Sequence, residues 1–183
     1  AIFFNAGLSY AHLVGFSLGG LIVQKFALSY PKRVGKLAIL SAIAGRTDTE
    51  RQHVQERIRN LEKGDLDANI ALALERWFSP EFRQNHPKRV QKRIAELRAT
   101  SPAGYFQAYR VFVLSDLAEH LSQIQCETLV MTGEHDPGSN VRMARLMHEA
   151  IPNSKLDILT NLRHSILVES PQLIAEKLDS FLR

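Results

Sequence analysis

The chain has 183 residues, of which 45% are hydrophobic and 23% are charged, a balance typical of one globular domain with a sizeable core. Its glycines and prolines follow no period and no run of about 18 apolar residues occurs, which excludes collagen-like and low-complexity chains and predicts no membrane span. The net charge is +4, and its excess of Lys and Arg lies between residues 46 and 110, where basic and acidic side chains alternate; this is typical of solvated helix faces, so we expect no nucleic-acid partner.

The first part of the chain, residues 1–45, has the pattern of a parallel sheet. An apolar run at 12–15 predicts a strand, the spacing over 18–30 predicts a helix, and residues 34–41 form a second apolar run. A strand, a crossover helix and another strand imply parallel pairing, and continuous apolar runs indicate strands buried on both faces. His12 is therefore expected in a buried strand.

The middle part, residues 46–125, lacks strand patterns and is predicted to be a helical insertion, which we call the lid. Asp65 and Ser101 are candidate helix N-caps. Apolar residues at three- and four-residue spacing predict helices over 54–61, 66–78, 90–97 and 105–114.

The strand pattern returns in residues 126–183. Strands are predicted at 128–132 and 155–160, and helices at 141–151 and 171–182. The expected fold class is therefore α/β: one mostly parallel sheet, in two sequence segments, that carries a helical lid.

A G-x-S-x-G motif, residues 15–19, stands directly between the first predicted strand and helix. On such a sharp turn the serine hydroxyl is exposed, and small residues on either side let strand and helix approach. Ser17 is the candidate nucleophile, and the backbone N–H of Leu18 is a candidate oxyanion donor. Gly20 adds a further position of close packing.

A serine nucleophile needs a base that is oriented by an acid. His164 follows the strand predicted at 155–160, whereas the other six histidines lie in predicted strands or helices or between two acids. Glu134 and Asp136 both follow the strand predicted at 128–132, and Asp136, which lies farther into the loop, is favoured. The order Ser17, Asp136, His164 is the one expected for an α/β-hydrolase triad.

No metal site or cofactor motif is found in the sequence. No H-E-x-x-H occurs, no Cys and His pair has ligand spacing, and the glycines at 15, 19 and 20 do not match G-x-G-x-x-G. We therefore expect neither a metal nor a cofactor.

These motifs resemble the α/β-hydrolase superfamily over nearly the whole chain, and the sequence is most similar to 3-oxoadipate enol-lactonases and related carboxylesterases. The resemblance is carried by residues 12–20, 75–82, 129–136 and 163–171. It implies that Ser17 is the nucleophile, His164 the general base and Asp136 its orienting acid.

The chain departs from this family at its start. Family members carry about four strands before the motif, and one of the intervening loops supplies a second oxyanion donor; residues 1–10 are too few for them. We expect a truncated gene product, an incomplete chain or one piece of a longer polypeptide. Loss of one oxyanion donor typically lowers turnover about 100- to 1000-fold.

The expected function is hydrolysis of a carboxylic ester or lactone through an acyl-enzyme. A same-triad acyltransferase, a carbon–carbon bond hydrolase and an inactive binding protein remain alternatives. The expected partner is a small-molecule ester or lactone, with no membrane, and a homodimer is left open. The single Cys126 favours a reducing compartment, so we expect a cytoplasmic protein.

Aromatic and basic residues are the candidates for substrate contact. Arg76, Arg110 and Arg142 are candidate partners for a substrate carboxylate, although a solvated helix position is the favoured interpretation of each. The aromatic candidates are Phe16 beside the nucleophile and, in the lid, Trp77, Phe78, Phe82, Tyr105, Phe106, Tyr109 and Phe112.

Overall fold

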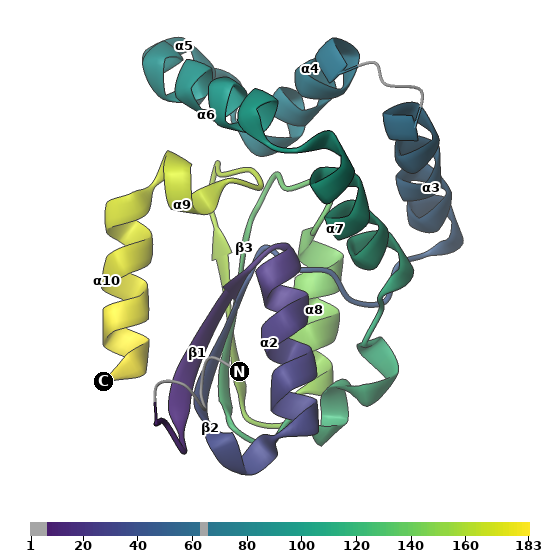
Figure 1. The fold of residues 1–183 in the computed structure, drawn as a ribbon. Coiled ribbons are helices and arrows are strands. Elements are labelled where there is room, and N and C mark those ends of the chain that lie inside the picture. Colours follow the sequence, from purple (N-terminus) through teal and green to yellow (C-terminus); the bar gives the residue numbers. More distant parts are fainter. Residues whose placement is uncertain (1–6, 63–65) are drawn as a thin grey trace.

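Four parallel strands form one sheet in the order β1-β2-β3-β4 in the computed structural model, which describes residues 7–62 and 66–183 (Figure 1). The strands are β1 (Ala11–Phe16), β2 (Val34–Leu40), β3 (Glu127–Gly133) and β4 (Ser154–Leu159). In the register, Phe16 pairs with Leu40 and Leu40 with Met131, so the carboxyl ends of these strands share one edge. The predicted α/β class with a parallel sheet is confirmed.

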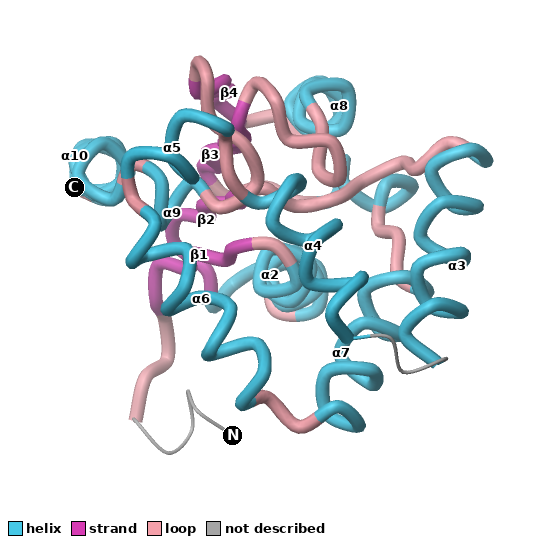
Figure 2. Tube along the Cα trace, turned by 90° about the horizontal axis from the view of Figure 1, so that it is seen from above, coloured by secondary structure: helices cyan, strands magenta, loops and turns pink. Residues whose placement is uncertain are grey.

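Helices cover both faces of this sheet. Helices α2 (Leu18–Ser29) and α8 (Val141–Ala150) lie on one face, and α10 (Pro171–Leu182) lies on the other (Figures 1 and 2). Successive side chains of a strand point to opposite faces. Accordingly, Leu37 and Ile39 of β2 belong to the core under α2 and α8, whereas Ala38 and Leu40 belong to the core under α10.

The remaining helices connect these layers or lie in the lid, residues 46–125. The lid helices α3 to α7 lie above the carboxyl ends of the strands (Figure 1). The bounds of these elements are η1 (Pro31–Arg33), α3 (Asp48–Glu62), α4 (Leu66–Trp77), α5 (Pro80–Asn85), α6 (Pro87–Ala99), α7 (Pro102–Leu114), η2 (Ala118–Gln123) and α9 (Ile166–Glu169). Within the two described ranges, no helix is long and apolar enough to cross a membrane.

The predicted elements are found, and the short helices α5 and α9 and the 3-10 helices η1 and η2 are added to them. Helices α5 and α9 span six and four residues, too few for a helical period to show in the sequence. Ser101 caps α7 as expected, because its side chain accepts the N–H of Gly104. The other candidate cap, Asp65, lies outside the described residues.

The expectation that every strand is fully buried was wrong for β1. The side chains of β1 alternate between the two faces of the sheet, so Leu13 packs against the core under α2 and α8 whereas His12 and Val14 point to the opposite face. His12 is exposed and accepts the N–H of Lys36 at 2.8 Å, and Val14 is 43% exposed. The face of the sheet to which these two side chains point is therefore not covered along this part of β1.

The two ends of the lid meet at Asp116. This carboxylate accepts the N–H groups of Gly45 and Arg46, at 2.9 and 3.0 Å. The buried Arg46 side chain in turn donates to the carbonyl oxygens of Phe112, Val113 and Ser115. Hydrogen bonds therefore fasten the chain entering the lid to the chain leaving it.

Candidate active site

The turn between β1 and α2 holds Ser17 in a strained backbone conformation. Its φ is 54° and its ψ is −116°, which a residue other than glycine adopts only at some cost. The backbone offsets this cost, because the N–H of Ser17 donates to the carbonyl of Leu40 at 2.8 Å and its carbonyl accepts the N–H of Gly20 at 2.9 Å. The side chain consequently stands at the carboxyl edge of the sheet.

The glycines around Ser17 differ in what they allow. A Cβ at Gly15 would collide with the carbonyl oxygen of Gly19, and a Cβ at Gly20 would lie 2.5 Å from the Cβ of Ala42. At Gly19 a Cβ would meet nothing within 4 Å. The sequence predicted that both flanking positions must be small. This is correct for Gly15 and wrong for Gly19, because only the backbone of Gly19 approaches the strand and a Cβ there would point into open space.

The structure brings together the three residues that the sequence singles out. The Nε2 atom of His164 lies 3.0 Å from the Oγ of Ser17, and its Nδ1 lies 2.7 Å from the Oδ2 of Asp136. The loops that carry these side chains follow β1, β3 and β4, whose carboxyl ends share one edge. The Asp136 side chain is fully buried, and that of His164 is 14% exposed.

Several hydrogen bonds hold the carboxyl group of Asp136 in place. Its Oδ1 accepts the N–H groups of Gly138 and Ser139, at 2.9 and 3.0 Å. Burial alone would raise the pKa of Asp136, but the charge and hydrogen bond of His164, together with these two N–H groups, hold it below its ordinary value. A carboxylate at this place favours a proton on Nδ1 of His164, which leaves Nε2 free to accept the hydroxyl proton of Ser17.

The alternative acid, Glu134, lies elsewhere. It is exposed and accepts the N–H of Asn161 at 3.0 Å. Its distance to the His135 ring is 3.8 Å, so it belongs to a surface pair. Of the two acids that follow β3, Asp136 alone contacts His164.

Leu18 is the first residue of α2, beside the Ser17 hydroxyl. The N–H groups of a helix's first turn have no partner within the helix and carry partial positive charge. The N–H of Leu18 thus remains the candidate oxyanion donor, at the start of α2.

A cavity of about 660 Å³ opens beside these residues, between the sheet edge and the lid. Phe16 and Leu18 line it, and the tilted Phe16 ring lies 5.2 Å from the His164 ring between centroids. Of the aromatic residues expected in the lid, four line the cavity, namely Trp77, Tyr105, Tyr109 and Phe112. Phe78 and Phe82 are instead buried in the core of the lid.

The lid is hydrogen-bonded to the loop that carries His164. The N–H of His164 approaches the carbonyl of Arg76 at 3.4 Å. The carboxylate of Glu169 in α9 connects the same two segments, since it accepts the N–H of Ser79 at 2.7 Å and that of Arg163 at 2.8 Å. This contact was not predicted from the sequence. Its sole signal in the sequence was a carboxylate five residues after His164.

The three candidate arginines separate in space. Arg76 lines the cavity. Arg142 instead pairs with Glu50 at 2.5 Å, and Arg110 is an exposed residue of α7. No group of three or more His, Cys, Asp or Glu that could hold a metal ion occurs among the side chains of residues 7–62 and 70–183.

The fold and this site define an α/β hydrolase. Residues 6–171 match the family described as alpha/beta hydrolase fold, so the chain belongs to that family. The fold is that of the enol-lactonase from Burkholderia xenovorans LB400, with a TM-score of 0.91 at 20% sequence identity over 99% of this chain and 68% of the other.

Two curated relatives are similar along most of the chain. An (E)-2-((N-methylformamido)methylene)succinate hydrolase from Acinetobacter baylyi is 31% identical over 174 residues, which is 93% of this chain and 64% of the relative. The 3-oxoadipate enol-lactonase 2 of the same organism is 28% identical over 94% of this chain and 64% of the relative. The chain thus spans about 64% of the length of these relatives.

Proposed function

We propose that this chain is the catalytic part of a serine hydrolase that cleaves a carboxylic ester or a lactone. In this proposal Ser17 is the nucleophile, His164 the general base and Asp136 the acid that orients the base. The observation that carries it is the continuous hydrogen-bond chain from Ser17 through His164 to Asp136, at 3.0 and 2.7 Å. A serine hydroxyl alone is a poor nucleophile, and this arrangement is what activates it.

The reaction proceeds by acyl transfer. The Oγ of Ser17 attacks the substrate carbonyl while Nε2 of His164 takes its proton, and the N–H of Leu18 stabilises the oxygen as it becomes negative. His164 then gives the proton to the leaving alkoxide, and an acyl-enzyme remains. Water, deprotonated by the same imidazole, attacks that acyl group and releases the acid, so that Ser17 regains its proton.

Two features support esters and lactones as substrates. The cavity beside Ser17 is lined by both apolar and polar side chains, including Phe16, Trp77 and Phe112, which suits a small organic molecule with polar groups. The relatives also include an enol-lactonase and a hydrolase of a succinate derivative.

The location that we propose is the cytoplasm. Cys126 has no second cysteine to pair with in residues 1–183, which supports a reducing compartment.

A fluorophosphonate probe tests the nucleophile directly. We expect the folded chain to be labelled at Ser17 and Ser17→Ala to remain unlabelled, with hydrolysis of a p-nitrophenyl ester lost in parallel. Absence of labelling in well-folded protein would favour an inactive binding protein. Product analysis with ester, lactone and β-diketone substrates then separates a hydrolase of esters from the acyltransferase and carbon–carbon alternatives.

A further inference from the structure

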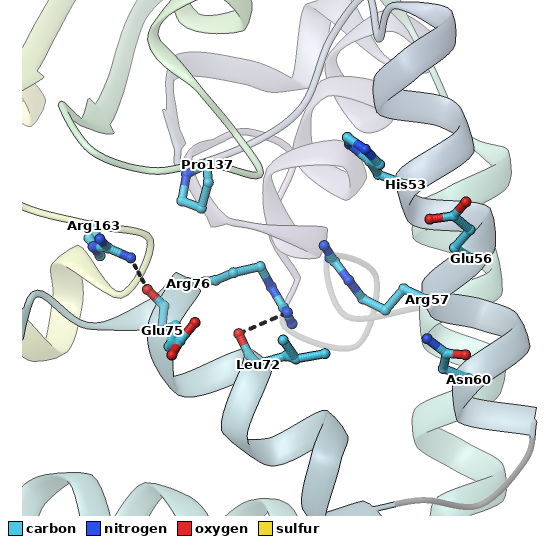
Figure 3. A pocket seen from close by; sticks show the side chains of 9 residues that line it. All are labelled: His53, Glu56, Arg57, Asn60, Leu72, Glu75, Arg76, Pro137 and Arg163. Carbon is cyan, nitrogen blue, oxygen red and sulfur yellow. Dashed lines mark hydrogen bonds between the residues drawn. The ribbon is translucent and has the colours of Figure 1, made fainter.

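Two arginines face each other where the active-site cavity meets a second cavity. Arg57 extends from α3 and Arg76 from α4, and their guanidinium groups approach one another across the gap between these helices (Figure 3). Both residues line the cavity that holds Ser17, and both line a side pocket of about 400 Å³. The two cations therefore stand at the boundary between the two spaces.

Other charged side chains that line the active-site cavity already have partners. Asp136 is bonded to His164, and Arg93 pairs with Glu96 at 3.1 Å. Glu50 pairs with Arg142, and Arg46 donates to three backbone carbonyls. Of the charged residues that line this cavity, Arg57 and Arg76 are the two whose partners are still to be described.

Neither of these two arginines has a carboxylate partner among residues 7–62 and 70–183, whose side chains the structure describes. Arg57 donates to the hydroxyl of Tyr109 at 3.0 Å, and Arg76 donates to the carbonyl of Leu72 at 2.9 Å. Glu56 and Glu75 line the side pocket, but neither forms an ion pair with them. Each guanidinium thus keeps N–H donors that no described acidic group uses.

The position of Arg76, partly buried and close to Arg57, disfavours its charged form. Burial, and secondly repulsion from Arg57, lower its pKa to about 10. Two partly desolvated cations side by side are unfavourable until an anion lies between them. A carboxylate suits this place best, because guanidinium groups bind its two oxygens in a planar fork.

We propose that Arg57 and Arg76 together bind a carboxylate carried by the substrate, at the boundary between the cavity of Ser17 and the side pocket. This inference rests on the proposed function and narrows it to esters and lactones of carboxylate-bearing acids. The backbone of Arg76 contacts the loop of His164, so a carboxylate held there has a defined position relative to the base. Tyr109 fixes the Arg57 side chain from the opposite helix.

A matched pair of esters tests the proposal. The p-nitrophenyl monoester of glutaric acid carries a free carboxylate, and p-nitrophenyl valerate has the same chain length without charge. We expect R57Q and R76Q each to lower the ratio of kcat/KM for the charged ester to kcat/KM for the neutral ester by about 10- to 100-fold, the effect of removing one hydrogen bond to a charged group. R76K is expected to fall between R76Q and the wild type, because lysine keeps the charge but not the fork.

The control is R110Q, which removes an exposed arginine outside the cavity and is expected to leave that ratio unchanged. An unchanged ratio in R57Q and R76Q, or an equal change in R110Q, would overturn the proposal.

A binding measurement separates this inference from the proposed function. Calorimetry on Ser17→Ala is expected to detect monomethyl glutarate but not dimethyl glutarate, and R57Q or R76Q in that background is expected to abolish the binding. Such binding in a chain whose Ser17 no fluorophosphonate labels would uphold the carboxylate site and refute the hydrolase. Hydrolysis of both p-nitrophenyl esters, with no preference for binding monomethyl glutarate over dimethyl glutarate, would uphold the hydrolase and refute the carboxylate site.

Discussion

The backbone N–H of Ser165 donates to the carbonyl oxygen of Trp77 at 2.9 Å, and this hydrogen bond joins the loop after β4 to the last turn of α4. Ser165 is the neighbour of His164, and Trp77 lines the substrate cavity. The candidate base and one wall of the cavity are therefore parts of one hydrogen-bonded unit. Glu169 completes this unit by accepting N–H groups from both sides.

Glu169 is accordingly predicted to position His164. In E169A the acceptor of both N–H groups is lost, and we expect kcat to fall by about 10- to 100-fold, because a small displacement of a catalytic group lowers the rate on that order. E169Q keeps one acceptor oxygen, and its kcat is expected to lie between that of E169A and that of the wild type. Rates are measured per active site titrated with a fluorophosphonate, so a mere loss of folded protein leaves them unchanged. E176A, which removes an exposed glutamate of α10, serves as the control.

Asp136 is predicted to act through the tautomer of His164. In D136N the amide nitrogen can donate to Nδ1, which moves the ring proton to Nε2 and prevents it from accepting the proton of Ser17. We expect kcat to fall by on the order of 10⁴-fold with the fold retained. E134Q tests the other acid after β3 and is expected to keep nearly full activity. A larger loss in E134Q than in D136N would contradict the assignment.

The glycines of the turn are predicted to respond differently to one added methyl group. G20A places a Cβ against that of Ala42, and we expect it to lower the free energy of unfolding by about 1–3 kcal/mol. G19A has open space, and alanine is favoured in a helix, so we expect stability to be kept or raised. Urea unfolding of the two variants gives the comparison. Equal loss in both would refute this account of the turn.

The joint of the lid is predicted to weaken in acid. Burial raises the pKa of Asp116, but the N–H groups of Gly45, Arg46 and Ala118 outweigh it, so the pKa lies below its ordinary value. A lowered folded-state pKa stabilises the fold above the unfolded value of about 4, and this contribution is lost as the pH falls through the folded value.

The variant D116N has no such titration. Its free energy of unfolding, measured by urea titration from pH 5 to pH 2, is expected to fall less steeply than that of the wild type. D48N changes a side chain that is 99% exposed and is the control. A wild-type slope in D116N would contradict the prediction.

Local sequence signals predicted the strands, most helices and the three residues of the candidate site, because each follows a strand whose carboxyl end faces the same edge. The exposure of His12 and Val14 on β1 was not predicted, since it depends on what covers that face of the sheet rather than on the strand's composition. Arg57 and Glu169 were also missed. Their roles arise from pairing with residues on other helices, and a charged residue on a helix has the same local pattern whether it faces solvent or a cavity.

Because Asp116 binds both the chain entering the lid and the chain leaving it, the two ends of the lid lie close together. Gly45 and Ala118 are close neighbours, since a Cβ on the glycine would lie 3.6 Å from that of the alanine. We expect that a different set of helices could be placed between these two points while the sheet and the loops that carry Ser17, Asp136 and His164 keep their positions. Exchange of the lid would then change the lining of the cavity without moving these three residues.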